Sequence, residues 1–195
     1  NLEAVSSAEL IVLSVKPQQF PGVATGLKGK LRSNQTVLSI IAGLTVPSIA
    51  SGLKHDAVIR VMPNTPAQIG QGMSVWMATD AVPEATRATA KELLSVLGLE
   101  WYVADEHYLD MATALSGSGP AYVFAFIESL IEAGVYMGMA RDMATTLAVQ
   151  TVLGSAQLAK ETGENPALLR ERVTSPGGTT AEALRELESH GLRST

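Results

Sequence analysis

The sequence predicts an α/β domain with a mostly parallel sheet, followed by an all-α domain. Short runs rich in Val and Ile alternate with helical stretches as far as Val103, and no convincing strand follows. The charge balance changes at the same place. Residues 1–103 hold eight Lys and Arg against seven Asp and Glu, whereas residues 104–195 hold six against twelve. We therefore expect two domains, 1–103 and 104–195.

The first domain contains five candidate strands with helical stretches between them. Pro83 suits the first turn of the clearest of these helices, and Gly98 suits the position just past its end. Strand, helix, strand repetition implies right-handed crossovers and parallel pairing. The candidate strands are residues 9–15, 36–43, 57–62, 73–79 and 99–103.

The second domain has helical periodicity throughout. Its central helix is apolar on nearly every face, with Gly134 and Gly138 spaced four residues apart. Such a helix must be buried on every face, and about 90 residues can hardly enclose it in a monomer. We favour a homodimer core over a monomeric bundle. The expected helices are residues 105–116, 120–138, 140–163, 165–172 and 180–190.

Composition narrows the classes of function. The net charge of −5, without a basic stripe, argues against nucleic acid or an anionic membrane as partner and favours small molecules or proteins. The absence of cysteine removes thiolate nucleophiles and Cys-ligated zinc. We interpret His55, His107 and His190 as surface residues without ligand spacing, so no metal is expected. Glu128 and Glu132 interrupt the most apolar stretch, so no membrane span is expected.

Three loops at the carboxyl ends of predicted strands form the first candidate binding site. Ligands of open parallel sheets bind beyond those ends. In the first loop Lys16 provides a cation, and in the second Gly43 allows a ligand to approach the backbone closely. In the third loop, prolines on both sides of Asn64 and Thr65 restrict the backbone that carries these polar side chains. Taken singly, each loop is better explained as an ordinary turn, whereas the three together favour a ligand-binding edge. The candidate residues are Val15, Lys16, Pro17, Ala42, Gly43, Asn64, Thr65 and Pro66.

The stretch "TSPGGTT", residues 174–180, is the second candidate site. Thr179 and Glu182 fit a capping box that starts a helix. Gly177 and Gly178 lack Cβ atoms, so a carboxylate could approach the helix N-terminus, with Ser175 and Thr180 adding hydroxyls. An ordinary capped helix explains the same residues, and local reasoning favours that simpler account.

Several of these segments together resemble the pyrroline-5-carboxylate reductase family, whose members catalyse the last step of proline biosynthesis. They are "VMPNTPAQIGQGMSVW", "LSGSGPAYVFAFIESLIEAGVYMGM" and "NPALLRERVTSPGGTTAEALRELE". The resemblance implies a Rossmann domain followed by a helical dimerisation domain, in a cytoplasmic enzyme whose dimers often assemble into decamers. It also implies hydride transfer from NADPH, or less often NADH, to the carbon–nitrogen double bond of L-1-pyrroline-5-carboxylate.

The resemblance assigns roles to both candidate sites. The loop at Val15, Lys16 and Pro17 would contact the adenosine and phosphate part of the cofactor, and the loops at 42–43 and 64–66 would contact the ribose and nicotinamide. Ser175, Gly177, Gly178, Thr179 and Thr180 would hold the substrate carboxylate from the partner subunit, with the Thr180 hydroxyl directed at the ring nitrogen as the catalytic group.

The chain departs from the Rossmann pattern in one respect. It contains no G-x-G-x-x-G phosphate turn and begins at Asn1 in mid-pattern, so we expect it to be an internal fragment. Two alternatives stay open. The chain could act only as an inactive dimerisation module, or it could belong to a related imine or hydroxyacid reductase. The absence of a lysine from "SPGGTT" argues against a hydroxyacid reductase.

Overall fold

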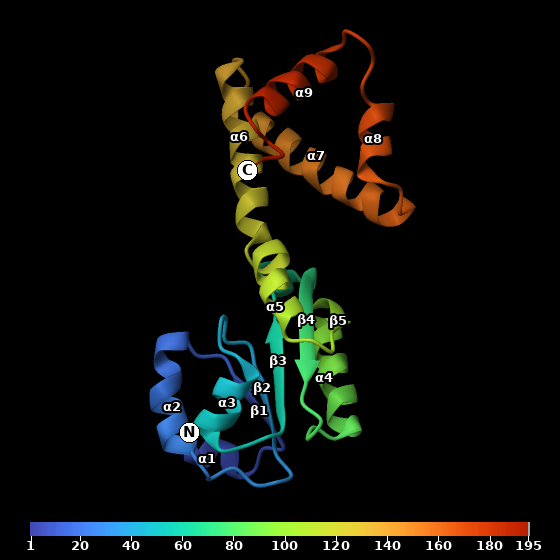
Figure 1. The fold of residues 1–195 in the computed structure, drawn as a ribbon. Coiled ribbons are helices and arrows are strands. Elements are labelled where there is room, and N and C mark those ends of the chain that lie inside the picture. The colour runs from blue at the N-terminus through green and yellow to red at the C-terminus, as the bar shows by residue number, and fades with distance from the viewer. Residues whose placement is uncertain (195) are drawn as a thin grey trace. The chain divides into compact units, whose positions relative to one another are not determined.

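The computed structural model describes residues 1–194 and contains two compact units, Asn1–Phe124 and Ala125–Thr195. The first unit consists of a five-stranded sheet with helices on both faces (Figure 1). Its strands are β1 (Leu10–Leu13), β2 (Thr36–Ser39), β3 (Val58–Met62), β4 (Gly72–Ala78) and β5 (Gly98–Tyr102). Its helices are α1 (Leu2–Ser6), α2 (Phe20–Leu27), α3 (Val46–Leu53), α4 (Glu84–Val96) and α5 (His107–Ala112). All five predicted strands are confirmed.

The sheet is mostly parallel, as predicted, with the strands in the order β1-β2-β3-β4-β5. Parallel pairing joins β1 to β2, β2 to β3 and β4 to β5. Strand β4 runs antiparallel to β3. The reason is the connection between them, a short 3₁₀ segment at Thr65–Ile69, because a parallel crossover needs a dozen or more residues.

Alternate residues of β3 contribute to the two faces of the sheet. Val58 packs with Ile49 and Leu53 of α3, in a cluster that also includes residues of α2. Ile59 and Val61 pack on the other face in a cluster that includes Leu94 of α4. The period of two that predicts a strand therefore also determines which helices cover each face. Figure 1 shows α2 and α3 on the opposite side of the sheet from α4.

Gly98 at the start of β5 provides a test of this packing. Its φ of +138° is a conformation that L side chains rarely adopt, and an added Cβ would lie 2.2 Å from the Gly72 carbonyl oxygen. We expect Gly98→Ala to lower the free energy of unfolding by about 2 kcal/mol or more, measured by urea titration. Gly26→Ala is the matched control, because Gly26 lies within α2 with nothing within 4 Å of its Cβ position. Equal stability of the two variants would contradict this account.

Helix α5 belongs to the sheet unit. Leu109 is fully buried and packs with Ala112 and Val75 of β4. This contact places residues 104–124 with the sheet, so the division between compact units falls later in the chain than the boundary expected near Ala104. The change in composition marks where strands give way to helices. The division between compact units lies later because α5 packs on the sheet.

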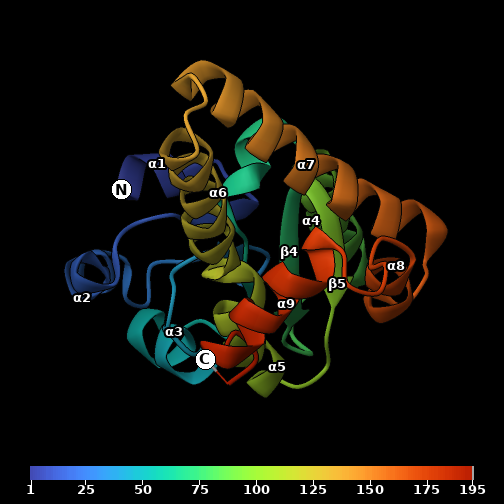
Figure 2. The same ribbon diagram turned by 90° about the horizontal axis from the view of Figure 1, so that it is seen from above.

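The remaining described residues are helical, as predicted. Helix α5 continues through a π-helical turn at Thr113–Gly117 into α6 (Gly119–Tyr136). The helices α7 (Arg141–Thr162), α8 (Pro166–Arg172) and α9 (Thr179–Ser189) follow, with α7 the longest (Figure 2). By length and mean hydropathy alone, residues 107–136 could cross a membrane, a property that core helices of soluble proteins share.

Within the second unit, small residues bring α6 and α7 close together. Gly134 is buried, and a Cβ at that position would lie 2.9 Å from the Ala144 Cβ. Ala144 and Ala148 are the buried residues of α7. Large apolar side chains remain exposed on both helices, including Phe126, Tyr136 and Leu147. The two helices therefore leave apolar surface that this unit does not cover by itself.

Candidate active site

The loops after β1, β2 and β3 lie along one edge of the sheet, because these three strands are parallel. The structure therefore brings the first candidate set together at that edge, as the order of the strands predicted. The set comprises Val15, Lys16, Pro17, Ala42, Gly43, Asn64, Thr65 and Pro66.

The loop after β1 forms a compact turn in which the Lys16 ammonium group makes no ion pair within residues 1–194. The Lys16 amide donates to Gln19 Oε1 at 3.1 Å, and the Gln19 amide donates to the Lys16 carbonyl at 2.8 Å. Pro17 begins a single 3₁₀ turn. The Lys16 side chain is exposed. It is available to an anionic ligand.

The loop after β2 has a solvent-exposed backbone at Ala42 and Gly43. Buried Ser39 accepts a hydrogen bond from the Ile41 amide at 3.2 Å, which fixes the start of the loop. Gly43 has a φ of +72°, and no heavy atom lies within 4 Å of its Cβ position. Thr45 then caps α3 through a hydrogen bond from the Ser48 amide at 3.4 Å. A ligand can therefore approach the backbone at Gly43, between two fixed ends.

Asn64 connects the loop after β3 to two other segments. Its Oδ1 accepts the Met73 amide at 2.8 Å, and its Nδ2 donates to the Ser116 carbonyl in the π-helical turn at 3.1 Å. Beside it lies an open apolar groove of about 310 Å³. The groove is lined by Asn64, Pro66, Leu115, Ser116, Gly119, Pro120, Val123 and Phe124. Asn64 thus fixes one wall of the groove against the sheet.

We expect Asn64→Asp to lower kcat/KM for the hydride transfer that the resemblance implies by about tenfold, because a carboxylate would face the Ser116 carbonyl without a donor. Asn34→Asp is the matched control, since Asn34 is exposed and undergoes the same chemical change. Steady-state kinetics of the two variants in the full-length protein provide the comparison. Equal kinetics would remove this role from Asn64.

The second candidate site lies in the helical unit, in the turn before α9. The Gly178 amide donates to the Ser175 carbonyl at 3.0 Å, and Gly177 has a φ of +68°. This is the pattern of a type II turn, in which proline takes the second position and glycine the third. Gly178 also has no room for a side chain, because a Cβ there would lie 2.6 Å from Ser175 Oγ.

The predicted capping box at Thr179 is wrong. Gly178 is the N-cap of α9 and Thr179 is its first helical residue. The Glu182 side chain pairs with Arg185 at 3.1 Å instead of reaching back. Glycine is an acceptable N-cap, and the turn before it sets the helix start. Thr180 is half-buried, and its hydroxyl makes none of the hydrogen bonds of residues 1–194.

Several titratable residues outside these loops have structural partners. His55 is buried and its Nε2 lies 2.7 Å from the Gln35 carbonyl, so its interpretation as a surface residue is wrong. Arg141 pairs with Glu132 at 2.8 Å, and the resulting hydrogen bond lowers the pKa of the Glu132 carboxyl. Within residues 1–194 no cluster of three or more His, Asp or Glu could hold a metal ion.

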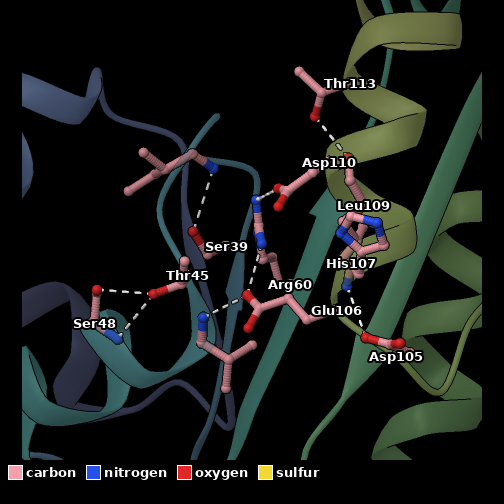
Figure 3. A network of polar contacts seen from close by, with 12 residues as sticks. Ser39, Thr45, Ser48, Arg60, Asp105, Glu106, His107, Leu109, Asp110 and Thr113 are labelled. Atoms are coloured by element: carbon pink, nitrogen blue, oxygen red, sulfur yellow. Dashed lines mark hydrogen bonds and ion pairs between the residues drawn. The ribbon is translucent and has the colours of Figure 1, made fainter.

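The sequence did not predict a buried ion-pair cluster near the β2 loop. Arg60 of β3 is 2% exposed and pairs with Glu106 at 2.6 Å and Asp110 at 3.2 Å (Figure 3). The signal was a single arginine inside the apolar run "AVIRVM". Its carboxylate partners lie 46 and 50 residues further along the chain, so local patterns could not reveal them.

Comparison with known proteins first defines a class. Residues 1–43 match the family model "NADP oxidoreductase coenzyme F420-dependent", and residues 106–195 match "Pyrroline-5-carboxylate reductase dimerisation". Together with the sheet and its three loops, these matches define a Rossmann-type nicotinamide oxidoreductase with a helical dimerisation region.

Individual relatives identify the family. The chain is 42% identical over 195 residues to a pyrroline-5-carboxylate reductase of Pisum sativum, covering 100% of this chain and 71% of that protein. A Synechocystis enzyme of the same name is 44% identical over 194 residues, covering 100% and 72%. The crystal structure of Plasmodium falciparum pyrroline carboxylate reductase with NADP bound superposes with a TM-score of 0.92 at 33% identity, covering 98% and 73%. The chain belongs to the pyrroline-5-carboxylate reductase family.

Proposed function

We propose that this protein reduces L-1-pyrroline-5-carboxylate to L-proline, using NADPH or NADH as hydride donor. The observation that carries the proposal is the 42% identity to the Pisum sativum reductase over the whole of this chain. The site chemistry agrees with it. A protonated imine is already an electrophile, so its reduction needs positioning and a dry site more than a strong nucleophile.

The three loops of the sheet edge fit a nicotinamide cofactor, which supplies the hydride when bound. Exposed Lys16 is a cation for a phosphate group, and Gly43 leaves space for close approach to the backbone. The loop from Asn64 to Pro66 lies beside the open apolar groove. These residues would bind and orient the cofactor.

The turn before α9 would bind the substrate carboxylate. The first amides of a helix attract anions, and the type II turn leaves Gly177 and Gly178 without side chains in the way. Thr180 is the second residue of α9, and its hydroxyl is not used within the described chain. It would hydrogen-bond the ring nitrogen and orient the iminium, with Ser175 completing the pocket.

Among the coenzymes, NADPH is the preferred proposal. The support is the NADP-bound Plasmodium falciparum relative and the NADP oxidoreductase model that matches residues 1–43. We further propose a homodimer in the cytoplasm, in which the substrate turn completes the partner's site, and dimers that assemble into a decamer. The exposed apolar faces of α6 and α7 support dimerisation more simply than a membrane span.

The test combines two measurements on the full-length protein: an activity assay with pyrroline-5-carboxylate and NADPH, and the oligomeric state by sedimentation. Pyrroline-dependent oxidation of NADPH, with proline as product, is the expected result. A dimer without turnover would instead favour the inactive dimerisation module. Turnover with other cyclic imines or hydroxyacids, but not with pyrroline-5-carboxylate, would favour a related reductase.

A further inference from the structure

A buried arginine in the sheet must have polar partners. Arg60 lies within β3, and its side chain is 3% exposed. A guanidinium that leaves water is costly unless it is paired and hydrogen-bonded. Both of its partners come from the region of α5: Glu106 Oε1 lies 2.6 Å from Nη1, and Asp110 Oδ1 lies 3.2 Å from Nη2. The ion pairs thus connect β3 to the start of α5 (Figure 3).

Glu106 makes a second contact that Asp110 does not. The same Oε1 atom accepts a hydrogen bond from the Val46 amide at 2.7 Å. Val46 is the first residue of α3, and it follows directly on the loop of residues 41–45. An anion at a helix N-terminus is favoured by the helix dipole. One carboxylate oxygen therefore joins Arg60 in the middle of the sheet to the end of the β2 loop.

Besides Glu106, the β2 loop is anchored by buried Ile41 and by the Thr45 cap of α3. Ser39 holds its beginning through the Ile41 amide, and a 3.4 Å backbone hydrogen bond from the Leu44 amide to the Ile41 carbonyl closes the turn. Ala42 and Gly43 between them are exposed. Where the loop enters α3, the Val46 amide meets the carboxylate of Glu106.

We propose that Glu106 is a positioning residue for cofactor binding. Oriented by Arg60, its carboxylate holds the end of the loop at residues 41–45, so that Ala42 and Gly43 present their backbone to the cofactor. The inference rests on the proposed function, because it assigns this loop to the nicotinamide cofactor. Glu106 acts through the loop and needs no contact with the cofactor.

The pair Glu106 and Asp110 offers a matched comparison. Both carboxylates pair with Arg60, but only Glu106 contacts the loop, and the Asp110 side chain is 63% exposed against 25% for Glu106. In the full-length protein, we expect Glu106→Ala to raise the Kd of NADPH about tenfold, measured by NADPH fluorescence. Asp110→Ala should raise it less than about twofold. The KM for the pyrroline substrate should stay within about twofold in both.

A conservative variant separates positioning from folding. Glu106→Gln retains an oxygen acceptor for the Val46 amide, so its NADPH Kd should fall between wild type and Glu106→Ala. If Glu106→Ala fails to fold, the comparison of Glu106→Gln with Asp110→Asn replaces it, and the larger rise in Kd is again expected at Glu106.

Two results would overturn the inference. One is an equal NADPH Kd for the variants at positions 106 and 110, and the other is a rise in substrate KM as large as the rise in NADPH Kd. Both require a wild-type protein that binds NADPH and turns over. A wild type that binds no nicotinamide cofactor and shows no turnover would instead overturn the proposed function, and with it this inference.

Discussion

Replacing Thr180 by alanine in the full-length protein should lower pyrroline-dependent NADPH oxidation by tenfold or more, which corresponds to about 1.4 kcal/mol. Thr180 is the second residue of α9, half-buried, and its hydroxyl makes no hydrogen bond within the part of the chain that the structure describes. The substitution removes little packing, so its effect should come from the lost contact to the ring nitrogen. The measurement is kcat and KM for the pyrroline substrate at saturating NADPH.

Two neighbouring variants control this prediction. Thr180→Ser keeps the hydroxyl and should recover most of the activity. Thr179→Ala removes a hydroxyl from the adjacent exposed position but keeps the backbone amide that would face the carboxylate, so it should stay within about threefold of wild type. Unchanged kinetics of Thr180→Ala would reject the role of its hydroxyl. An equal loss in Thr179→Ala would indicate a general effect on the helix start.

Phe126→Asp should convert the proposed dimer into a monomer at micromolar concentration. Phe126 lies on α6 within the helical unit and is 46% exposed there. An aromatic side chain buried at an interface contributes strongly to association, and a charge in its place would have to be buried without a partner. We expect the dimer dissociation constant to rise by about a hundredfold or more, measured by sedimentation. Turnover should fall with it, because the substrate turn would come from the partner.

Ser95→Asp is the control for added charge, because Ser95 is an exposed residue of α4 in the sheet unit. Its sedimentation and turnover should match those of wild type. A stable, active monomer in Phe126→Asp would contradict both the shared helical core and the shared active site. A dimer of unchanged stability would place Phe126 outside the interface.

Most of the fold was predictable because its strands are marked by local composition. Runs such as "TVLSII" and "AVIRVM" are apolar over the length of a strand and end at turn residues. The helical start at Thr179 was not predicted correctly, because the preceding turn at Ser175–Gly178 made Gly178 the N-cap. The burial of His55 was also not predicted, because its hydrogen-bond partner is the Gln35 carbonyl, 20 residues earlier in the chain. The first error concerns a local turn and the second a tertiary contact, and periodicity encodes neither.

The candidate site was predictable in part for a similar reason. Parallel strands place their carboxyl ends along one edge, so three loops could be grouped from the order of strands alone. What the sequence could not provide is how those loops are fixed. Asn64 reaches Ser116, 52 residues away, and Arg60 reaches Glu106, 46 residues away. Such contacts exist only after α5 has packed on the sheet.

Following the transferred hydride tests the proposed reduction of pyrroline-5-carboxylate. The full-length protein is incubated with L-1-pyrroline-5-carboxylate and NADPH deuterated at the transferable position of the nicotinamide ring, and the product is analysed by mass spectrometry. We expect L-proline carrying one deuterium at the ring carbon that was double-bonded to nitrogen. Cofactor oxidation without labelled proline, or no oxidation with this substrate in a folded dimer, would contradict it.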